Sequence, residues 1–233
     1  MTDLAIDTAG AGCCVALQFG RAEDVRVISR FEAQTRGQSE RVISLIEGLL
    51  EEADLDYQSL KRIICTMGPG SFTGVRVGLA LAKGLALAAE VPLFGVSRTL
   101  VLGHKFFLDQ QEEQGCDVFA CLLDAGRDEF YGQVFSGSGG QFCVLSEPVL
   151  IAQSGLKDFL ARFNVGLVIG SGLEAVEGLG VLEQCRHEFV SQSEDLFLIE
   201  APYLIQGEGV KPLYLRAPDA KPQQGKALKR SLP

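Results

Sequence analysis

The chain has 233 residues, 47% of them hydrophobic and 8% aromatic, so it can bury a proper core and is not expected to be disordered. Its formal net charge of −9 argues against unaided binding to nucleic acid. That affinity comes mainly from lysine and arginine side chains that displace counterions from phosphates. We therefore expect any contact with RNA to be made through a partner protein.

The cysteines and the N-terminal residues bear on the compartment. Seven cysteines without regular spacing do not form the pattern of a disulfide framework and are typical of a reducing cytosol. The first residues, MTDLAIDTAG, lack a basic segment followed by a long apolar one, so we expect no signal peptide. No run reaches the roughly 18 uninterrupted apolar residues of a membrane span. We predict a cytoplasmic protein without a membrane partner.

The N-terminal part predicts a meander of three strands, at residues 4–6, 13–19 and 25–31, with Asp7 at the end of the first. One interpretation of Asp7 is a turn residue whose carboxylate accepts a hydrogen bond from its own backbone. The other rests on a resemblance. A meander that opens with an aspartate resembles the start of the fold shared by actin, sugar kinases and acetate kinase, in which this turn lies at the nucleotide phosphates and metal.

Two helices follow the meander. The pattern predicts the first over residues 38–53, with one apolar face and glutamates opposite. After a buried strand at residue 63, the chain breaks at Gly68-Pro69-Gly70 and continues as a second helix, for which Ser71 is the candidate N-cap. This helix is apolar or small around nearly its whole circumference, which is more than one buried stripe requires.

The second helix therefore has two candidate faces. We expect a bulky row to fill the core of its own domain and a small row to admit the backbone of a partner; the alternative is that both faces are core. Glycine inside a helix costs roughly 1 kcal/mol against alanine, so it needs a reason. The small row consists of Gly74, Gly78, Ala82 and Ala86.

These residues carry a second resemblance. MGPGSFTGVRVGLALAKGLA is similar to the signature segment of the bacterial TsaB (YeaZ) family, the non-catalytic subunit in biosynthesis of threonylcarbamoyladenosine on tRNA. KPLYLR, residues 211–216, is similar to a short strand near that family's C-terminus. The resemblance implies a catalytic TsaD-type homologue and a TsaE-type ATPase as partners. It also implies a partner surface on two adjacent helices, which we predict at Val42, Ile46, Leu49, Gly74, Gly78, Ala82 and Ala86.

Such a self-complementary surface also favours a two-fold homodimer when the partner is missing, so homodimer and heterodimer are expected to compete. Under this hypothesis a leucine at Gly78 abolishes partner binding and leaves the monomer folded.

The second half of the chain opens as the first does. CLLDAGR, which contains Asp124, repeats the pattern of LAIDTAG weakly, as duplicated halves of an actin-like fold would. The polar run DQQEEQG marks the boundary between them. We predict an α/β protein of two actin-like subdomains of the sugar kinase or acetate kinase type, each a mixed sheet with flanking helices. Their expected bounds are residues 1–110, with the partner-binding helices, and 111–216, before a basic tail at 217–233.

Motifs of phosphate and metal chemistry are weak. GPGSFTG has neither the spacing nor the lysine of a phosphate-binding P-loop. In the TsaD family two histidines four apart bind the metal, and the resemblance places Arg98 and Leu102 at those positions. His104 and His187 are predicted to be surface or satisfied helix residues. No serine stands in G-x-S-x-G, which gives little support to a glycoprotease-like hydrolase.

Two hypotheses of different class remain. The first is a non-catalytic scaffold or activator of a complex that transfers a threonylcarbamoyl group to the adenosine beside the anticodon of tRNAs reading codons that begin with A. It has no catalytic, cofactor or metal residues of its own, and it meets tRNA only through the complex. The second is a small phosphotransferase that uses Asp7 and Asp124 beside a nucleotide. The absent motifs favour the first.

Overall fold

The computed structural model describes residues 1–21, 23–33, 38–110, 117–177, 184–185 and 192–216. The first sheet has the strand order β12-β5-β4-β1-β2-β3, in which β12 is the short strand Ile205–Gln206. The antiparallel meander that the sequence predicts forms one side, and two parallel strands continue from β1. The elements are β1 (Thr2–Asp7), β2 (Gly12–Arg21), β3 (Asp24–Ala33), α1 (Gln38–Glu52), η1 (Tyr57–Ser59), β4 (Arg62–Thr66), α2 (Phe72–Ala88) and β5 (Leu93–Val96).

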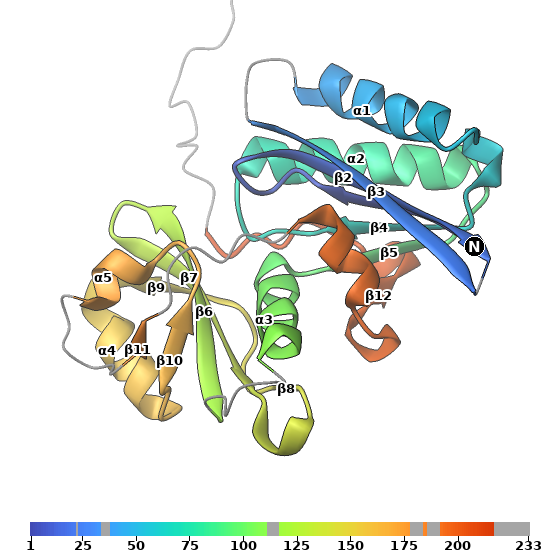
Figure 1. Cartoon of the computed structure of the whole chain (residues 1–233). Coiled ribbons are helices and arrows are strands. Elements are labelled where there is room, and N and C mark those ends of the chain that lie inside the picture. The colour runs from blue at the N-terminus through green and yellow to red at the C-terminus, as the bar shows by residue number, and fades with distance from the viewer. Residues whose placement is uncertain (22, 34–37, 111–116, 178–183, 186–191, 217–233) are drawn as a thin grey trace, which may run out of the picture.

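The second sheet begins in the same way, with an antiparallel hairpin and then a parallel strand beside the first strand of the hairpin. This repeat confirms the predicted two-part actin-like architecture (Figure 1). Its elements are β6 (Val118–Gly126), β7 (Glu129–Ser136), η2 (Ser138–Gly140), β8 (Cys143–Val144), β9 (Val149–Ala152), α4 (Gln153–Arg162), β10 (Leu167–Ile169), α5 (Leu173–Glu177) and β11 (Gln184–Cys185).

Alternating side chains divide each sheet between two cores. Leu4 and Ile6 pack with α1 and α2, whereas Ala5 between them packs on the opposite face with α3 (Arg98–Asp109). In the second sheet Phe119 faces α3 and Ala120 faces α4. Because successive side chains of a strand point to opposite faces, each sheet is covered on both sides. Helix α3 lies between the two lobes, and α1 with α2 forms the outer layer of the first lobe (Figure 1).

Serine caps begin α2 and α3. The Ser71 hydroxyl accepts a hydrogen bond from Gly74 N at 3.2 Å, as the sequence predicts, and the Ser97 hydroxyl accepts one from Leu100 N at 3.2 Å. Each cap satisfies a backbone donor that the first helical turn leaves without a partner. No helix in the described part of the chain is long and apolar enough to cross a membrane.

The C-terminal segment departs from the expected assignment of all of residues 111–216 to the second lobe. It contains η3 (Ser193–Leu198), η4 (Ala201–Tyr203), β12 (Ile205–Gln206) and η5 (Gly207–Gly209), and β12 pairs with β5 of the first sheet. The last part of 111–216 therefore returns to the first lobe, because its apolar residues complete that lobe's cores: Leu196 joins the core around α3 and Val210 the core under α2. The expected boundary near residue 110 and the tail at 217–233 fall at or within residues outside those described.

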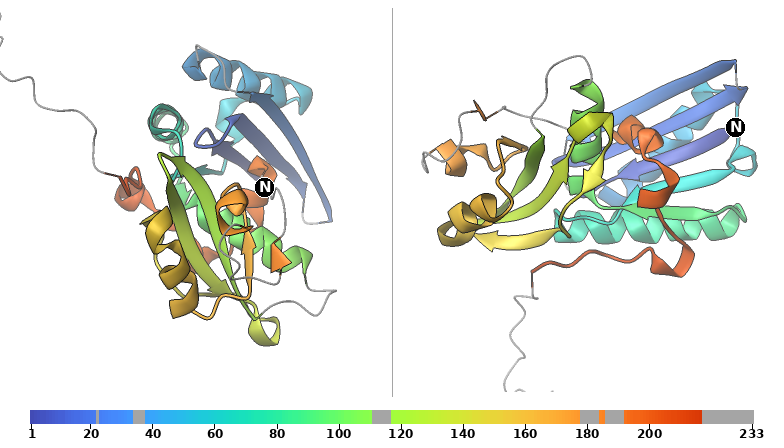
Figure 2. Two further views of the ribbon diagram at one scale, coloured as in Figure 1. Left: turned by 90° about the vertical axis from the view of Figure 1, so that its left-hand side faces the viewer. Right: turned by 90° about the horizontal axis from the view of Figure 1, so that it is seen from below.

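Residues 211–216 do not form the expected strand. Instead, the segment runs beside α2 and back toward the second lobe (Figure 2). Leu213 N donates to Met67 O at 2.8 Å, and Arg216 donates to Gly126 O at 3.0 Å. An isolated backbone bond of this kind fixes the segment in place without a ladder of strand pairing.

Candidate functional site

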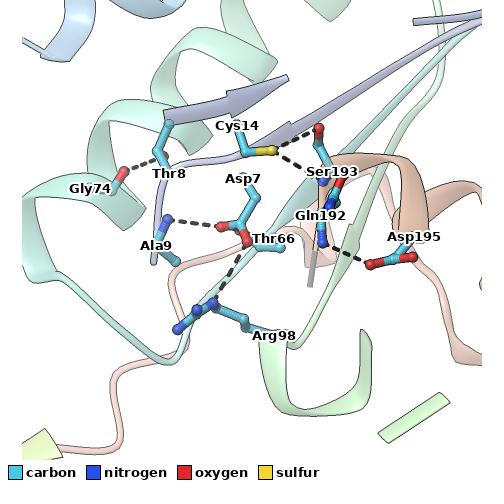
Figure 3. Close-up of polar contacts among 10 residues, drawn as sticks. All are labelled: Asp7, Thr8, Ala9, Cys14, Thr66, Gly74, Arg98, Gln192, Ser193 and Asp195. Atoms are coloured by element: carbon cyan, nitrogen blue, oxygen red, sulfur yellow. Dashed lines mark hydrogen bonds and ion pairs between the residues drawn. The ribbon is translucent and has the colours of Figure 1, made fainter. Parts of the chain in front are cut away.

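Asp7 lies in the first sheet at the C-terminal ends of the parallel strands β1 and β4. Its side chain is buried, and one carboxylate oxygen accepts hydrogen bonds from Ala9 N at 2.9 Å and from the Thr66 hydroxyl at 2.7 Å. The bond from Ala9 confirms the interpretation of Asp7 as a turn residue. The second carboxylate oxygen points toward α3 and lies 3.6 Å from Arg98 Nε (Figure 3).

Arg98 supplies a cation at this carboxylate. It is the first residue of α3, and its side chain is packed so closely against the β1–β2 turn that a Cβ on Gly10 would lie 2.9 Å from Nη2. Arg98 Nε is buried and makes no hydrogen bond in the described part, so the 3.6 Å contact is an ion pair and not a hydrogen bond. Arg98 thus lies beside the first-strand aspartate.

The corresponding aspartate of the second lobe has a different environment. Asp124 is exposed; its carboxylate accepts from Gly126 N at 2.7 Å, and its N–H donates to the Ser171 hydroxyl at 3.0 Å. Arg216 binds that turn through Gly126 O and pairs with Glu129. Among the described residues no group of three or more histidine, cysteine or acidic side chains could hold a metal ion. The geometry gives the phosphotransferase alternative no additional support.

The seven residues predicted as the partner surface lie in the protein's own interior. Val42, Ile46 and Leu49 are fully buried, and the four small residues of α2 are buried as well. A Cβ on Gly74 would lie 1.9 Å from Thr8 O, and one on Gly78 would lie 2.2 Å from the Thr8 hydroxyl oxygen. The predicted assignment of faces is therefore wrong: the small row admits the β1–β2 turn of the same chain.

Thr8 explains this close approach. Its hydroxyl donates to Gly74 O at 2.6 Å (Figure 3). In addition, Ser71 N donates to Ala9 O at 2.9 Å. These bonds hold the first turn of α2 against the strand-end turn that contains Asp7. Since the helix must approach a backbone, glycine is required where a side chain would collide. The rest of the small row, Ala82 and Ala86, packs in the same core.

The opposite face of α2 is open. Leu87 is 82% exposed and Ala80 is also exposed, while a Cβ on Gly84 would meet nothing within 4 Å. On neighbouring α1, Ile43 is 40% exposed and a Cβ on Gly48 would also meet nothing within that distance. We call the exposed residues Ile43, Gly48, Phe72, Ala80, Gly84 and Leu87 the outer face of α1 and α2.

Three further features were not found from the sequence. His104 is 2% exposed and lacks a hydrogen bond at Nδ1, which corrects its expected place as a surface or satisfied residue; His187 lies outside the described residues. The Cys14 thiol donates a hydrogen bond to the Ser193 hydroxyl, and burial raises the pKa of that thiol. Burial also raises the pKa of Cys65 to about 12, so this thiol is unreactive.

The third feature is an exposed cluster of Phe72, Arg76 and Tyr214 at the N-terminal end of α2. The four-residue spacing of Phe72 and Arg76 puts them on one helix face and could have indicated a pair. No local pattern could have added Tyr214, which is 138 positions from Arg76 in the sequence.

Together, the repeated sheets and their strand-end aspartates define a two-lobed α/β protein of the actin-like class. The family model described as TsaD, tRNA N6-adenosine threonylcarbamoyltransferase, matches residues 31–152. The tRNA threonylcarbamoyladenosine biosynthesis protein TsaB of Escherichia coli K12 is 34% identical over 227 residues, which are 93% of this chain and 95% of that protein. The chain belongs to the TsaB family of tRNA threonylcarbamoyladenosine biosynthesis proteins, as its motifs predict.

Two other comparisons show a similar solved structure and a partial similarity to an enzyme. A crystal structure of a Pseudomonas aeruginosa protein with similarity to peptidase YEAZ has a TM-score of 0.73 at 26% identity, covering 92% of this chain and 99% of that one. A tRNA N6-adenosine threonylcarbamoyltransferase of Salinibacter ruber is 35% identical over 95 residues, which are 41% of this chain and 28% of the enzyme. The chain thus resembles both the TsaB proteins and part of the transferase.

Proposed function

We propose that this chain is a non-catalytic subunit that supports a TsaD-type homologue in transferring a threonylcarbamoyl group to the adenosine beside the anticodon of tRNAs that read A-starting codons. The resemblance to TsaB proteins over nearly the whole chain and to the transferase over part of it supports this role. The pairing of Asp7 with Arg98 is consistent with a chain that does not use this aspartate for metal chemistry. A TsaE-type ATPase, access to tRNA only through the complex, and a cytosolic location belong to the same proposal.

The observation that carries the proposal is the outer face of α1 and α2. Leu87 is 82% exposed, and Ala80, Gly84 and Ala88 are exposed beside it on the same helix, together with the single cation Lys83. Exposed apolar side chains gathered on adjacent elements mark protein interaction sites. The face also avoids the seven buried residues that the sequence predicted, so the two helices remain the proposed interface while the contact residues change.

A change at Leu87 tests this interface. Leu87→Asp introduces a charge where the partner is expected to remove water, so its affinity for the TsaD homologue of the same host should fall at least about tenfold. Leu145→Asp is the matched control, because Leu145 is 42% exposed on the second lobe. Affinity is measured by titration calorimetry, and threonylcarbamoyladenosine in tRNA is measured by mass spectrometry in a depleted host that carries each variant.

The two variants separate the outcomes. The host with Leu87→Asp should lose the modification, and the host with Leu145→Asp should retain it. Equal affinity of both variants would place the interface elsewhere. Undiminished modification in the host without any copy of the protein would reject the function itself. In the absence of the partner the same face is proposed to form a two-fold homodimer, so Leu87→Asp should also shift the isolated protein toward monomer in sedimentation.

A further inference from the structure

The cluster at the start of α2 holds one guanidinium group between two exposed aromatic rings. The guanidinium carbon of Arg76 lies 3.8 Å from the ring centroid of Phe72 and 5.5 Å from that of Tyr214. Arg76 Nε donates to the Tyr214 hydroxyl at 2.6 Å, and the two ring centroids are 5.4 Å apart. These contacts fix the side chain, and less conformational freedom remains to be lost when a ligand binds.

Arg76 has no carboxylate partner in the part of the chain that the structure describes. Its Nε is occupied by Tyr214, and no hydrogen bond to either Nη engages this side chain among the described residues. Phe72 is 52% exposed and Tyr214 47%, so both rings are also open to contact. The arrangement therefore presents a planar cation with apolar walls at the surface.

A planar guanidinium recognises a carboxylate or a phosphate through parallel N–H donors. The two sources differ in what else they require. RNA needs several cations to displace counterions, and this chain has a net charge of −9, whereas a protein carboxylate needs one paired cation and apolar surroundings. Phe72 belongs to the outer face of α1 and α2, so the cluster is continuous with the surface proposed for the partner protein.

We propose that Arg76, held by Phe72 and Tyr214, anchors the partner subunit by receiving the carboxylate of one of its aspartate or glutamate side chains. This inference rests on the proposed function and adds the chemistry that the partner must present. The apolar outer face supplies the buried area, and the Arg76 cluster at its edge sets the register of the two subunits. Arginine and tyrosine are enriched among the few residues that dominate interface energies.

The test compares Arg76 with a cation on the other lobe. Arg76→Gln removes the charge and Arg76→Lys keeps it without the planar fork; Lys157→Gln neutralises an exposed control cation on α4. We expect both Arg76 variants to bind the TsaD homologue at least about tenfold more weakly, and Lys157→Gln to stay within about threefold. Tyr214→Phe, which removes only the hydroxyl acceptor, should give an intermediate loss.

The acidic partner is found by a double-mutant cycle. Each exposed aspartate or glutamate of the TsaD homologue is changed to its amide and titrated against both the wild-type chain and Arg76→Gln. One amide variant should weaken binding to the wild-type chain and add nothing to Arg76→Gln. If every pair is additive, the carboxylate anchor is wrong.

The remaining outcomes are distinct. If Arg76→Gln binds as tightly as wild type while Leu87→Asp does not bind, the anchor is overturned and the proposed function stands. If the wild-type chain does not bind the TsaD homologue, the proposed function fails first. If Arg76→Gln retains the partner but the assembled complex loses tRNA in a filter-binding assay, the occupant is a phosphate and the inference is overturned. Equal melting temperatures of wild type and Arg76→Gln exclude a folding defect.

Discussion

At the residue scale, His104 is the clearest departure from the usual place of its residue type. It lies in α3 against an aromatic cluster, with its ring centroid 5.0 Å from that of Phe142 in an edge-on contact and 6.4 Å from that of Tyr203. Burial lowers the pKa of His104, and the Glu200 carboxylate raises it by a smaller amount. The neutral ring therefore suits this site, and the charged ring would lose its hydration there.

A pH dependence of stability follows from this pKa. The unfolded chain binds a proton at His104 near pH 6.5, whereas the folded chain binds it only at lower pH. Stability should therefore fall as the pH drops below about 6.5. The fall continues until the pH reaches the depressed pKa of the folded state. Between pH 7.5 and 5.5 the melting temperature of His104→Leu, measured by calorimetry, should fall less than that of the wild type. Equal falls in the two proteins would contradict this.

At the scale of elements, the faces of α2 are assigned by its glycines. A Cβ on Gly78 would collide with the Thr8 hydroxyl, while Gly84, six positions later, has open space around it. Glycine at Gly78 is therefore needed for packing within the chain. Glycine at Gly84 costs helix stability without any gain inside the chain, which is the cost expected where a second backbone approaches.

Alanine at each glycine measures this difference. Gly78→Ala should destabilise the protein by about 1 to 3 kcal/mol through overpacking, and Gly78→Leu by more, so that the monomer no longer folds normally. Gly84→Ala should stabilise it by up to about 1 kcal/mol. Urea unfolding monitored by circular dichroism gives both values. A folded, stable Gly78→Leu protein would mean that the small row of α2 does not face the core.

At the scale of the whole molecule, α3 joins the two lobes through its first turn. Arg98 pairs with Asp7 of the first lobe, and the Thr99 hydroxyl donates to the Gln133 side chain of the second lobe at 2.6 Å. Thr99 and Gln133 are both buried, so this bond lies within the core between the lobes. Removing one partner of such a buried contact lowers the free energy of unfolding, because the remaining polar group then has neither its partner nor water to bind.

The ion pair gives a prediction for a double-mutant cycle. Asp7→Asn or Arg98→Met alone should cost about 2 to 4 kcal/mol, because each leaves a largely buried charge without its partner. The double variant should cost less than the sum, since no unpaired charge remains. Unfolding free energies in urea test the cycle. Additive costs would show that Asp7 is held by Ala9 and Thr66 alone.

The sequence by itself determined the class of fold and the family. Strand alternation, helical periodicity, the Ser71 cap and the break at Gly68-Pro69-Gly70 are local, so they predicted the meander, α1, α2 and the repeated start of the second lobe. The signature segment around α2 predicted the TsaB family, and residue type alone offered the turn interpretation of Asp7 that the hydrogen bond from Ala9 supports. These features depend on neighbours within a few positions.

Only the tertiary structure decided which faces are used. A helix that is apolar on all sides does not specify which side meets its own sheet. The contact of Gly74 with Thr8, which lies 66 positions earlier in the sequence, fixes the side of α2 that faces inward. In the same way, Arg98 meets Asp7, Tyr214 meets Arg76, and β12 returns to the first sheet across long separations. Contacts between residues far apart in sequence leave no local periodicity, so no pattern along the chain could have assigned them.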